Sequence, residues 1–541
     1  MAAMTGGEAL VAALINEGVS TIFGLPGVQL DGAFDALWGA RDRIAVLHTR
    51  HEQATAYMAD GYARTTGRVG TALVVPGPGL LNASAALCTA YACNAPVLMI
   101  AGQVQSQYID AGRGLLHEIP DQLGMIRHVT KWAGRAMSPA EIPGLVHEAF
   151  RQMLTGRPRP VEIEIPPDVL LARGDVTLRE PFQPERLQPD TDLIDRAARV
   201  LGQAERPLIF SGGGVLAAAA WEELRQIADM LQAPVIATQN GRGAISDRSY
   251  LSQPQLAAQV LAPQADAILA VGTRFLTPAT APWGPKPEQP VVRLDIDPAE
   301  IERVHRPTIG IVADAKAGLA ALAERLPRYN RARPSREEEL RALQSRAHEL
   351  LNTVQPQAAY AGVIRAEMPD DGIVVSEMTQ VGYWANQGFP VYEPRTYLTP
   401  GYQGTLGWGF GFALGAQAGN PTKKVLSING DGGFGYQLAE LSTIVRHNLP
   451  VITVVFNDNA YGNVRRIQRQ QYNGHVIASD LLNPDFVKLA EAFGIEGRRA
   501  ASPEEFRLAL RSALANDHPT LIEVQMPPTE ELPSTWNLSL K

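Results

Sequence analysis

A glycine-rich turn with one acidic residue follows an apolar stretch in the last third of the chain. Residues 425–434 read VLSINGDGGF, so a predicted buried strand leads into Asp431 and then into a predicted helix with apolar residues from Leu438 to Val445. The free N–H groups and positive dipole end of such a helix attract an anion, and glycine lets that anion approach the backbone. Asp431 would repel a phosphate unless a cation lay between them, so the segment predicts a phosphate site bridged by magnesium.

A second group of oxygen ligands follows the next predicted strand. Residues 451–457 form a β-rich run that ends in Asn457, and Asp458 and Asn459 come directly after it. In doubly wound sheets, ligands bind at the carboxyl ends of the strands, where these side chains and Asp431 would meet. A Gly-Asp-Gly motif alone is often only a turn. Two such clusters at neighbouring strand ends favour a metal site.

The elements that must position these residues are parallel sheets covered by helices. Short β-rich runs alternate with helical stretches along the sequence, which is the pattern of an α/β protein. The predicted strands are residues 20–24, 44–48, 71–75, 97–101, 161–165, 207–214, 234–239, 267–273, 291–297, 373–377, 396–400, 425–430, 451–457 and 520–526. A chain of 541 residues is too long for one core and should divide into domains. Three similar modules are expected, without detectable sequence repetition.

Two polar stretches separate these modules. Residues 173–191, which contain Pro and Arg, are predicted to form a linker, and the charged residues 328–351 are predicted to form a solvated connection. The domains are therefore expected at residues 1–175, 190–335 and 355–541.

Composition argues against several classes of protein. The net charge is −8 and no basic block stands out, so neither nucleic acid nor an anionic membrane surface is expected as a partner. No uncharged apolar run reaches the ~20 residues of a membrane helix, and residues 1–18 are typical of an amphipathic helix rather than a signal peptide. Cys88 and Cys93, the only cysteines, are expected to be buried thiols. We expect a cytoplasmic protein.

Taken together, these motifs resemble the thiamine diphosphate-dependent enzymes of the acetolactate synthase, pyruvate oxidase and benzaldehyde lyase superfamily. The similarity covers nearly the whole chain and includes residues 24–31, 50–64, 74–82, 156–169, 292–301, 404–416 and 484–494. It implies an α/β protein of three doubly wound parallel-sheet domains. These would be a pyrimidine-binding domain, a central Rossmann-like domain, and a diphosphate- and metal-binding domain, in that order along the chain.

The resemblance also implies a set of cofactor and metal ligands. Asp431, Asp458 and the carbonyl of Ala460 would hold Mg²⁺, although Asp458 stands where Asn is usual and adds a negative charge. Leu406 matches the apolar residue beneath a bent cofactor, and it could equally be an ordinary core leucine. The positions expected to contact thiamine diphosphate are Pro26, Asn82, Gln380, Gly404, Leu406, Gly430, Gly432, Gly433, Asp458, Tyr461 and Gly462.

Glu52 is the expected proton relay. By itself, a glutamate in the first turn of a helix is usually an exposed partner of the helix dipole. In the family, however, the Glu of this R-H-E-x-A motif hydrogen-bonds the aminopyrimidine N1′ of the cofactor, so that the exocyclic nitrogen of the cofactor can deprotonate C2 of the thiazolium. The resemblance therefore implies a catalytic role for Glu52.

Further positions are expected to determine the substrate. Gln29 stands where benzaldehyde lyase-like proteins carry His, and His117, where related sequences often have Gln, could orient a substrate carbonyl or serve only the structure. The segment from Asn463 to Gln468 stands where typical acetolactate synthases have a more apolar one, including a Trp at the position of Ile467, so a polar substrate is suggested. Arg465 or Arg466 could bind a carboxylate bidentately, although adjacent arginines on a helix more often face solvent.

The expected activity is that of a thiamine diphosphate- and Mg²⁺-dependent 2-oxo acid decarboxylase or carboligase similar to acetolactate synthase. The alternatives are a lyase or hydrolase acting on 2-hydroxy ketones or diketones and, less favoured because Glu52 is retained, a non-catalytic regulator. FAD is possible but not expected in the central domain, where Gly212 to Gly214 and Arg274 lie near predicted strand ends. The resemblance further implies a homodimer or homotetramer with active sites between subunits.

Overall fold

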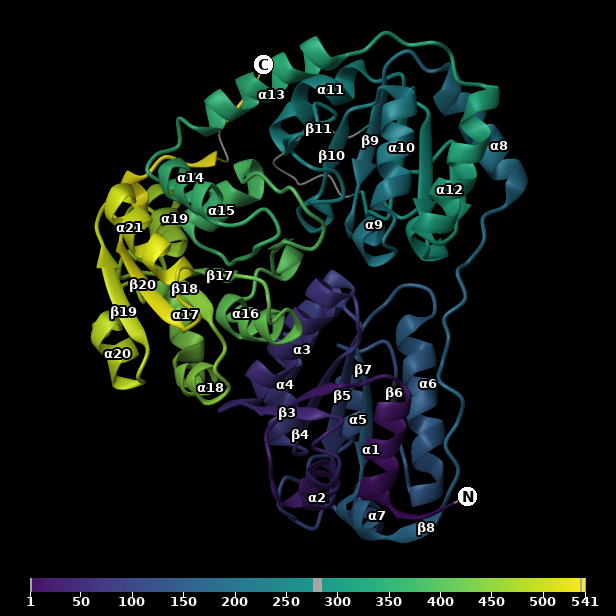
Figure 1. The fold of residues 1–541 in the computed structure, drawn as a ribbon, viewed down its shortest axis with the longest axis vertical. Helices are drawn as coiled ribbons and strands as arrows, with labels where there is room; N and C mark the ends of the chain where they lie inside the picture. Colours follow the sequence, from purple (N-terminus) through teal and green to yellow (C-terminus); the bar gives the residue numbers. More distant parts are fainter. Residues whose placement is uncertain (1, 276–284, 536–537, 541) are drawn as a thin grey trace.

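The N-terminal part of the chain forms the first of three six-stranded sheets in the computed structural model, which describes residues 2–275, 285–535 and 538–540 (Figure 1). All its strand pairings are parallel. The strand order is β3 (Ala45–His48), β2 (Thr21–Gly24), β4 (Gly70–Val74), β5 (Val97–Gly102), β7 (Val161–Ile165) and β6 (Ala133–Arg135). The main helices are α1 (Gly6–Asn16), α2 (Asp31–Gly39), α3 (Glu52–Thr66), α4 (Pro78–Cys93) and α6 (Ile142–Leu154), with the shorter α5 (Gln122–Ile126) and α7 (Pro167–Leu171).

The central sheet is also parallel but has a different strand order, that of the Rossmann fold. Its strands are β11 (Ser252–Gln253), β10 (Val235–Ala237), β9 (Pro207–Ser211), β12 (Ala267–Val271), β13 (Val291–Asp295) and β14 (Ile309–Val312). The accompanying helices are α8 (Thr191–Gln203), α9 (Gly213–Ala217), α10 (Trp221–Leu231), α11 (Ala258–Gln264) and α12 (Ala315–Arg325).

The C-terminal sheet repeats the connectivity of the first sheet. Its strands, all parallel, are β16 (Tyr397–Leu398), β15 (Ile373–Ser376), β17 (Val425–Gly430), β18 (Val451–Asn457), β20 (Thr520–Gln525) and β19 (Glu496–Ala500). Its helices are α14 (Gln357–Glu367), α15 (Gln380–Gly388), α16 (Trp408–Gly419), α17 (Asp431–Phe434), α18 (Leu441–Arg446), α19 (Gly462–Gln471), α20 (Phe486–Ala492) and α21 (Pro503–Leu514). Three doubly wound α/β units are therefore confirmed.

Every predicted strand is present, and the strands that the sequence pattern missed lie mostly at sheet edges. β6, β11, β14 and β19 are edge strands. β19 reads EGRRA, and only Ala500 in it is buried, so it carries no apolar run that would predict a strand. β1 (Ala2–Thr5) pairs antiparallel with β8 (Arg173–Val176) as a small separate sheet.

Both predicted connections contain more structure than expected. β8 occupies the first residues of the predicted linker 173–191. The charged region 328–351 contains α13 (Glu337–Leu351), which crosses from the central to the C-terminal part of the molecule in Figure 1 and buries Leu340 and Leu343 in the core. The description of this region as solvated is thus wrong for one face of the helix, because its apolar residues recur at helical spacing.

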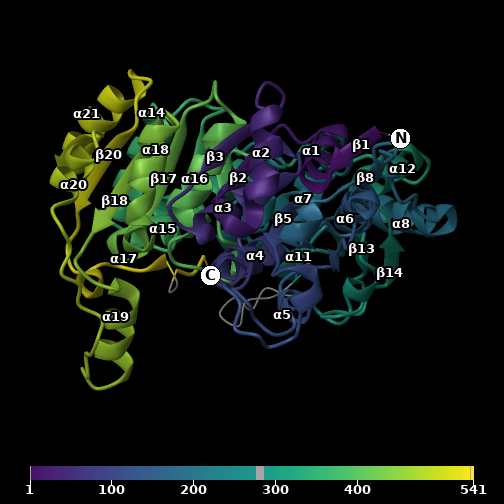
Figure 2. The same ribbon diagram turned by 90° about the horizontal axis from the view of Figure 1, so that it is seen from below.

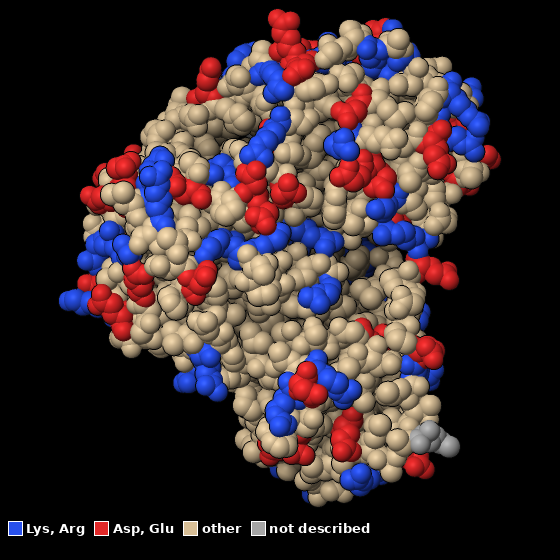
Figure 3. Space-filling model, viewed as in Figure 1, with Lys and Arg blue, Asp and Glu red and all other residues tan. Residues whose placement is uncertain are grey.

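Two smaller expectations also need correction. The single helix predicted after Asp431 is three pieces, α17, a 3-10 helix (Gly435–Glu440) and α18, with Gln437 in a non-helical conformation between them. Cys88 and Cys93 are free thiols as expected, but both are half-buried rather than buried. No helix among the described residues is long and apolar enough to cross a membrane. Acidic and basic side chains are interspersed over the face shown in Figure 3.

A close contact between α3 and α16 joins the first and third sheets; the two helices lie side by side in Figures 1 and 2. A Cβ atom at Gly61 would lie 2.1 Å from the carbonyl oxygen of Phe412, and one at Gly415 would lie 1.9 Å from that of Met58. Both positions therefore require glycine. Beside this contact the indole of Trp408 donates a 3.2 Å hydrogen bond to the buried Asp60.

A buried carboxyl group lies where β15 ends beneath the start of α16. Glu377 is 1% exposed and accepts a hydrogen bond from the N–H of Gly407, the residue that precedes α16. Burial raises the pKa of Glu377 to about 8, while the N–H groups of Gly407, Gly409 and Trp408 act in the opposite direction. The same side chain fills the space beside Gly433, where an added Cβ would lie 2.4 Å from Glu377 Oε1.

Glu377 should make the stability of the cofactor-free protein fall as the pH rises. The folded protein keeps this proton up to about pH 8, whereas the unfolded chain loses it near the ordinary value of 4.5, so the free energy of unfolding decreases between these two pH values. We therefore expect the melting temperature of Glu377→Gln, relative to the parent, to rise from pH 5.5 to pH 8.5. The control is Glu338→Gln, at an exposed position of α13, which removes a surface carboxyl and leaves Glu377 in place. An unchanging difference for Glu377→Gln would contradict the assignment.

Candidate functional site

The Gly-Asp-Gly turn and the second oxygen cluster lie at adjacent strand ends, as predicted. Gly430 at the end of β17 pairs with Phe456 of β18, so Asp431 and the residues from Asn457 onward leave the same edge of the sheet side by side. Asp431 begins α17, and Tyr461 lies against Gly432, whose Cβ would be 2.8 Å from the tyrosine ring. The parallel register therefore brings together groups that are far apart in sequence.

Asp431 and Asp458 form a pair of interacting carboxylates. Asp431 is 2% exposed. Burial raises its pKa to about 6, the negative charge of Asp458 adds to this, and the amide of Asn483 and the N–H groups of Gly432 and Ala460 oppose it. Burial likewise raises the pKa of Asp458. Two like charges at one buried edge favour a cation between them, so this pair suits a divalent ion.

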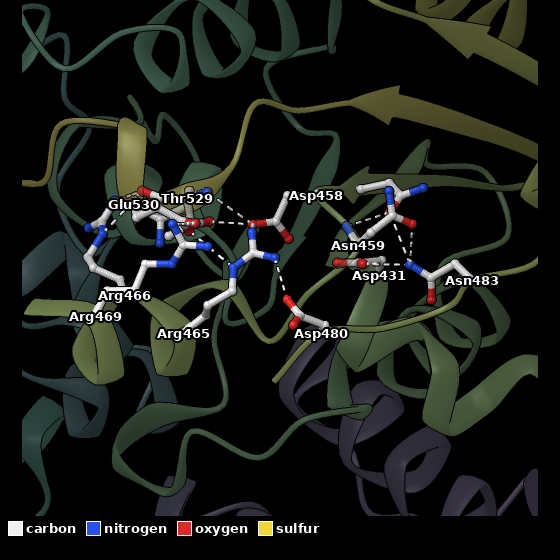
Figure 4. Close-up of polar contacts among 12 residues, drawn as sticks. Asp431, Asp458, Asn459, Arg465, Arg466, Arg469, Asp480, Asn483, Thr529 and Glu530 are labelled. Atoms are coloured by element: carbon white, nitrogen blue, oxygen red, sulfur yellow. Dashed lines mark hydrogen bonds and ion pairs between the residues drawn. The ribbon is translucent and has the colours of Figure 1, made fainter. Parts of the chain in front are cut away.

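Asn483 was not singled out from the sequence, and it belongs to this site. Its Nδ2 donates to Asp431 at 2.7 Å, to Asn457 at 3.1 Å and to Asn459 at 3.3 Å (Figure 4). Three oxygen acceptors therefore surround one positively polarised group. The only sequence signal was the position of Asn483, directly before the family-like segment 484–494.

The expected metal ligands are two carboxylates and one backbone carbonyl, which is a smaller acidic set than three or more side-chain ligands. In the part of the chain that the structure describes, no group of three or more His, Cys, Asp or Glu side chains is placed to hold a metal. Ala460 lies beside Asp431, since its N–H interacts with that carboxylate, and it forms an isolated bridge with Asp480. Asp431, Asp458 and Ala460 are therefore neighbours.

Two further loops reach the same sheet edge. Gln380 is the first residue of α15, directly after β15, and Thr379 approaches Gly430, whose Cβ would lie 3.4 Å from the Thr379 Cβ. Gly404 and Leu406 lie in the turn between β16 and α16. Leu406 is half-buried and belongs to none of the core clusters, so its interpretation as an ordinary core leucine is wrong.

The candidate residues of the N-terminal sheet also gather at carboxyl strand ends. Pro26 and Gln29 follow β2, Glu52 follows β3, Asn82 lies in α4 after β4, and His117 follows β5. The Nδ2 of Asn82 donates to Glu52 Oε2 at 3.0 Å. His117 Nδ1 lies 3.0 Å from Gln29 Oε1, and Gln29 Nε2 donates to the carbonyl of Leu116. Glu52 with Asn82, and Gln29 with His117, are thus two contacting pairs.

Arg465 and Arg466 differ from both interpretations made from the sequence. They are 7% and 5% exposed, so they do not face solvent. Arg465 pairs with Asp480 at 2.9 Å and with Glu530 at 3.2 Å, and Arg466 donates to the carbonyls of Thr529 and Leu532. Partners within the chain occupy both guanidinium groups, so neither is available to bind a substrate carboxylate in this arrangement. The sequence could not show these partners because they lie up to 66 residues away.

The triple glycine of the central sheet has a packing role. A Cβ at Gly212 would lie 2.2 Å from the carbonyl oxygen of Gly272, and one at Gly214 would lie 2.6 Å from its Cα. Arg274 donates to the carbonyl of Ala92 at 2.9 Å. These residues are therefore explained without a nucleotide, and FAD binding stays an untested possibility.

Comparison with known proteins agrees with this geometry. Residues 4–125 match the N-terminal TPP binding domain of thiamine pyrophosphate enzymes, residues 194–322 the central domain, and residues 377–524 the C-terminal TPP binding domain. The probable acetolactate synthase large subunit of Methanocaldococcus jannaschii is 34% identical over 98% of this chain and 93% of that protein. The probable 2-ketoarginine decarboxylase of Pseudomonas aeruginosa is 34% identical (96% and 94%), and the acetolactate synthase isozyme 2 large subunit of Escherichia coli is 32% identical (99% and 97%).

All three domains, together with relatives aligned over nearly the full length, lead to one conclusion: the chain belongs to the thiamine pyrophosphate enzyme family.

Proposed function

We propose that this protein is a thiamine diphosphate- and Mg²⁺-dependent decarboxylase of a polar 2-oxo acid, with or without transfer of the product to a second carbonyl. The observation that carries the proposal is the pair Asp431 and Asp458 at adjacent strand ends, where a divalent cation would join them to a diphosphate. When bound, thiamine diphosphate supplies a nucleophilic carbon and an electron sink for breaking a bond next to a carbonyl.

The protein's own groups would bind and orient. Asp431, Asp458 and the carbonyl of Ala460 would hold the cation. The turn from Gly430 to Gly433, together with Gln380, would bind the diphosphate, since two helices begin at this edge. Leu406, half-buried beside these loops, would support the cofactor.

The contacting pairs of the N-terminal sheet would serve the chemistry. Glu52 would hold a proton at N1′ of the aminopyrimidine, and the 3.0 Å bond from Asn82 would fix its carboxylate. Gln29 and His117 would orient the substrate carbonyl as a hydrogen-bonded pair.

The choice of a polar substrate rests on similarity and not on Arg465 or Arg466. The relatives include acetolactate synthases and a probable decarboxylase of 2-ketoarginine, a 2-oxo acid with a polar side chain. This combination supports 2-oxo acids as the substrate class and leaves two product types to be separated by experiment.

Loading the protein with thiamine diphosphate and Mg²⁺ and supplying pyruvate, 2-ketoarginine and other polar 2-oxo acids should release CO₂. Mass spectrometry of the organic product would then distinguish aldehyde release from ligation. CO₂ release from none of these acids, with cofactor bound at full stoichiometry, would contradict the decarboxylase. It would favour the alternative, a lyase or hydrolase acting on 2-hydroxy ketones or diketones.

Glu52→Gln should bind thiamine diphosphate and Mg²⁺ normally while slowing hydrogen exchange at C2 of the bound cofactor by about a hundredfold or more, because the side chain can no longer share a proton with N1′. Acid quenching in D₂O followed by NMR measures this rate. The matched variant Glu338→Gln, on the exposed face of α13, should exchange like the parent. Normal exchange in Glu52→Gln would remove Glu52 from the relay.

Exposed apolar side chains border both halves of the site. Val28 and Leu116 lie beside Gln29 and His117, while Tyr436 and Leu482 lie near Asp431 and Asn483. α19 projects from the body of the molecule in Figure 2, and the segment after it exposes Ile477. Exposed apolar rims of this kind support contact with another subunit. We accordingly propose a homodimer or homotetramer in which Glu52 of one subunit serves the diphosphate site of another.

Subunit mixing tests this arrangement directly. Glu52→Gln and Asp431→Ala should each be inactive, but co-expression should restore about a quarter of the parental activity, because half of the dimers would be mixed and each would hold one intact site. Activity per dimer is measured after separating the species by two affinity tags. If Glu52 and Asp431 of the same chain formed one site, the mixed dimers would stay inactive.

A further inference from the structure

A short C-terminal turn contacts the second carboxylate of the metal loop. The chain leaves β20 at Gln525 and forms a 3-10 turn at Thr529–Glu531. Thr529 is buried, and both its N–H, at 3.2 Å, and its hydroxyl, at 2.7 Å, donate to Asp458 Oδ2. Thr529 follows Asp458 by 71 residues, so this contact depends on the fold and not on local sequence.

The contacts of Asp458 are one-sided. Its only ion pair among the described residues, with Arg465 Nη2 at 3.9 Å, also involves Oδ2. Within the same residues, every hydrogen bond of its carboxylate goes to Oδ2. Figure 4 shows this oxygen facing Thr529 and Arg465, with Asp431 on the other side of Asp458. Oδ1 is therefore the oxygen left to bind a cation.

The turn itself is held firmly by α19. Arg466, which is 5% exposed, donates to the carbonyl of Thr529 at 3.2 Å and to that of Leu532 at 3.0 Å. Glu530 pairs with Arg465 at 3.2 Å and with Arg469 at 3.2 Å. Three arginines of one helix thus fix the turn from which Thr529 reaches Asp458 (Figure 4). These contacts give the three arginines a structural role that does not involve the substrate.

We propose that Thr529 is a positioning residue of the metal site: its hydroxyl and N–H hold Oδ2 of Asp458, which keeps Oδ1 directed toward the divalent cation. The inference rests on the proposed function, because it concerns the same cation. Outer-shell donors orient carboxylate ligands and lower the cost of ordering them on binding, and their loss typically weakens metal affinity by about 10–100-fold. By the same linkage, a bound cation should stabilise the docked turn.

The test compares Thr529→Val, which keeps the shape but lacks the hydroxyl, with Thr529→Ser, which keeps the hydroxyl. Calorimetric titration of Mg²⁺ in saturating thiamine diphosphate should show about tenfold or greater weakening for the valine variant and near-parental affinity for the serine variant. The melting temperature in chelator should be similar for the two variants, since a hydroxyl with a purely structural role would make the valine variant melt lower even without metal. Unchanged affinity in Thr529→Val, or equal weakening in both variants, would overturn the proposal.

Hydrogen exchange on the parent gives an independent test that needs no variant. Amides of residues 526–532 should exchange more slowly with Mg²⁺ and thiamine diphosphate than in chelator, while those of α8, which packs on the central sheet and its helices, should not change. Equal exchange of residues 526–532 in both conditions would overturn the coupling. If the parent bound no Mg²⁺ at all, the proposed function would fail first, and the titration would show this separately from the Thr529 variants.

Discussion

Repulsion between two carboxylates at one buried sheet edge is the constraint around which the last domain is built. Asp431 and Asp458 follow strands that are paired in register, so they cannot move apart without breaking the sheet. Burial raises the pKa of Asp431, and the negative charge of Asp458 raises it further. Asn483 and the N–H groups of Gly432 and Ala460 donate hydrogen bonds to Asp431. Thr529 donates hydrogen bonds to Asp458, and Arg465 forms an ion pair with it. The negative charge that remains on Asp431 and Asp458 suits a cation, and the cation can in turn bind a diphosphate.

Close packing at the same edge explains why glycine occurs where helices of this domain begin. Loops after β16, β15 and β17 converge there, and the buried Glu377 fills the space between the start of α16 and Gly433. α16 in turn packs on α3 at a distance that only Gly61 and Gly415 allow. α3 begins at Glu52. The expected proton relay therefore lies at the start of a helix that packs on α16, the helix whose first residues Glu377 and Gly433 adjoin.

Apolar runs and local motifs could be recognised in the sequence, whereas features that depend on long-range contacts could not. Central strands were found because they are continuous apolar runs, whereas the edge strand β19, with two arginines, carries no such signal. Asp431, Asp458 and Glu52 could be proposed from the sequence because their motifs are local and resemble those of a known family. Asn483, Thr529 and Glu377 could not, because their roles come from partners in other loops. The arginines of α19 were misinterpreted for the same reason: nothing within a helical turn of Arg465 indicates Glu530.

The aspartate at position 458 is related to the charged side chains around it. An asparagine could accept both hydrogen bonds from Thr529, but it would leave Arg465 facing only Asp480 and Glu530. With aspartate, one buried guanidinium lies among three carboxylates, and Arg469 shares the charge of Glu530. Two arginines against three carboxylates leave one negative charge in this group, so Arg465 offsets the charge of Asp458 only in part and a bound cation would offset the rest. The departure from the usual Asn and the inward-facing arginines are thus connected: α19 supplies part of the counter-charge, and the C-terminal turn contacts both Asp458 and α19.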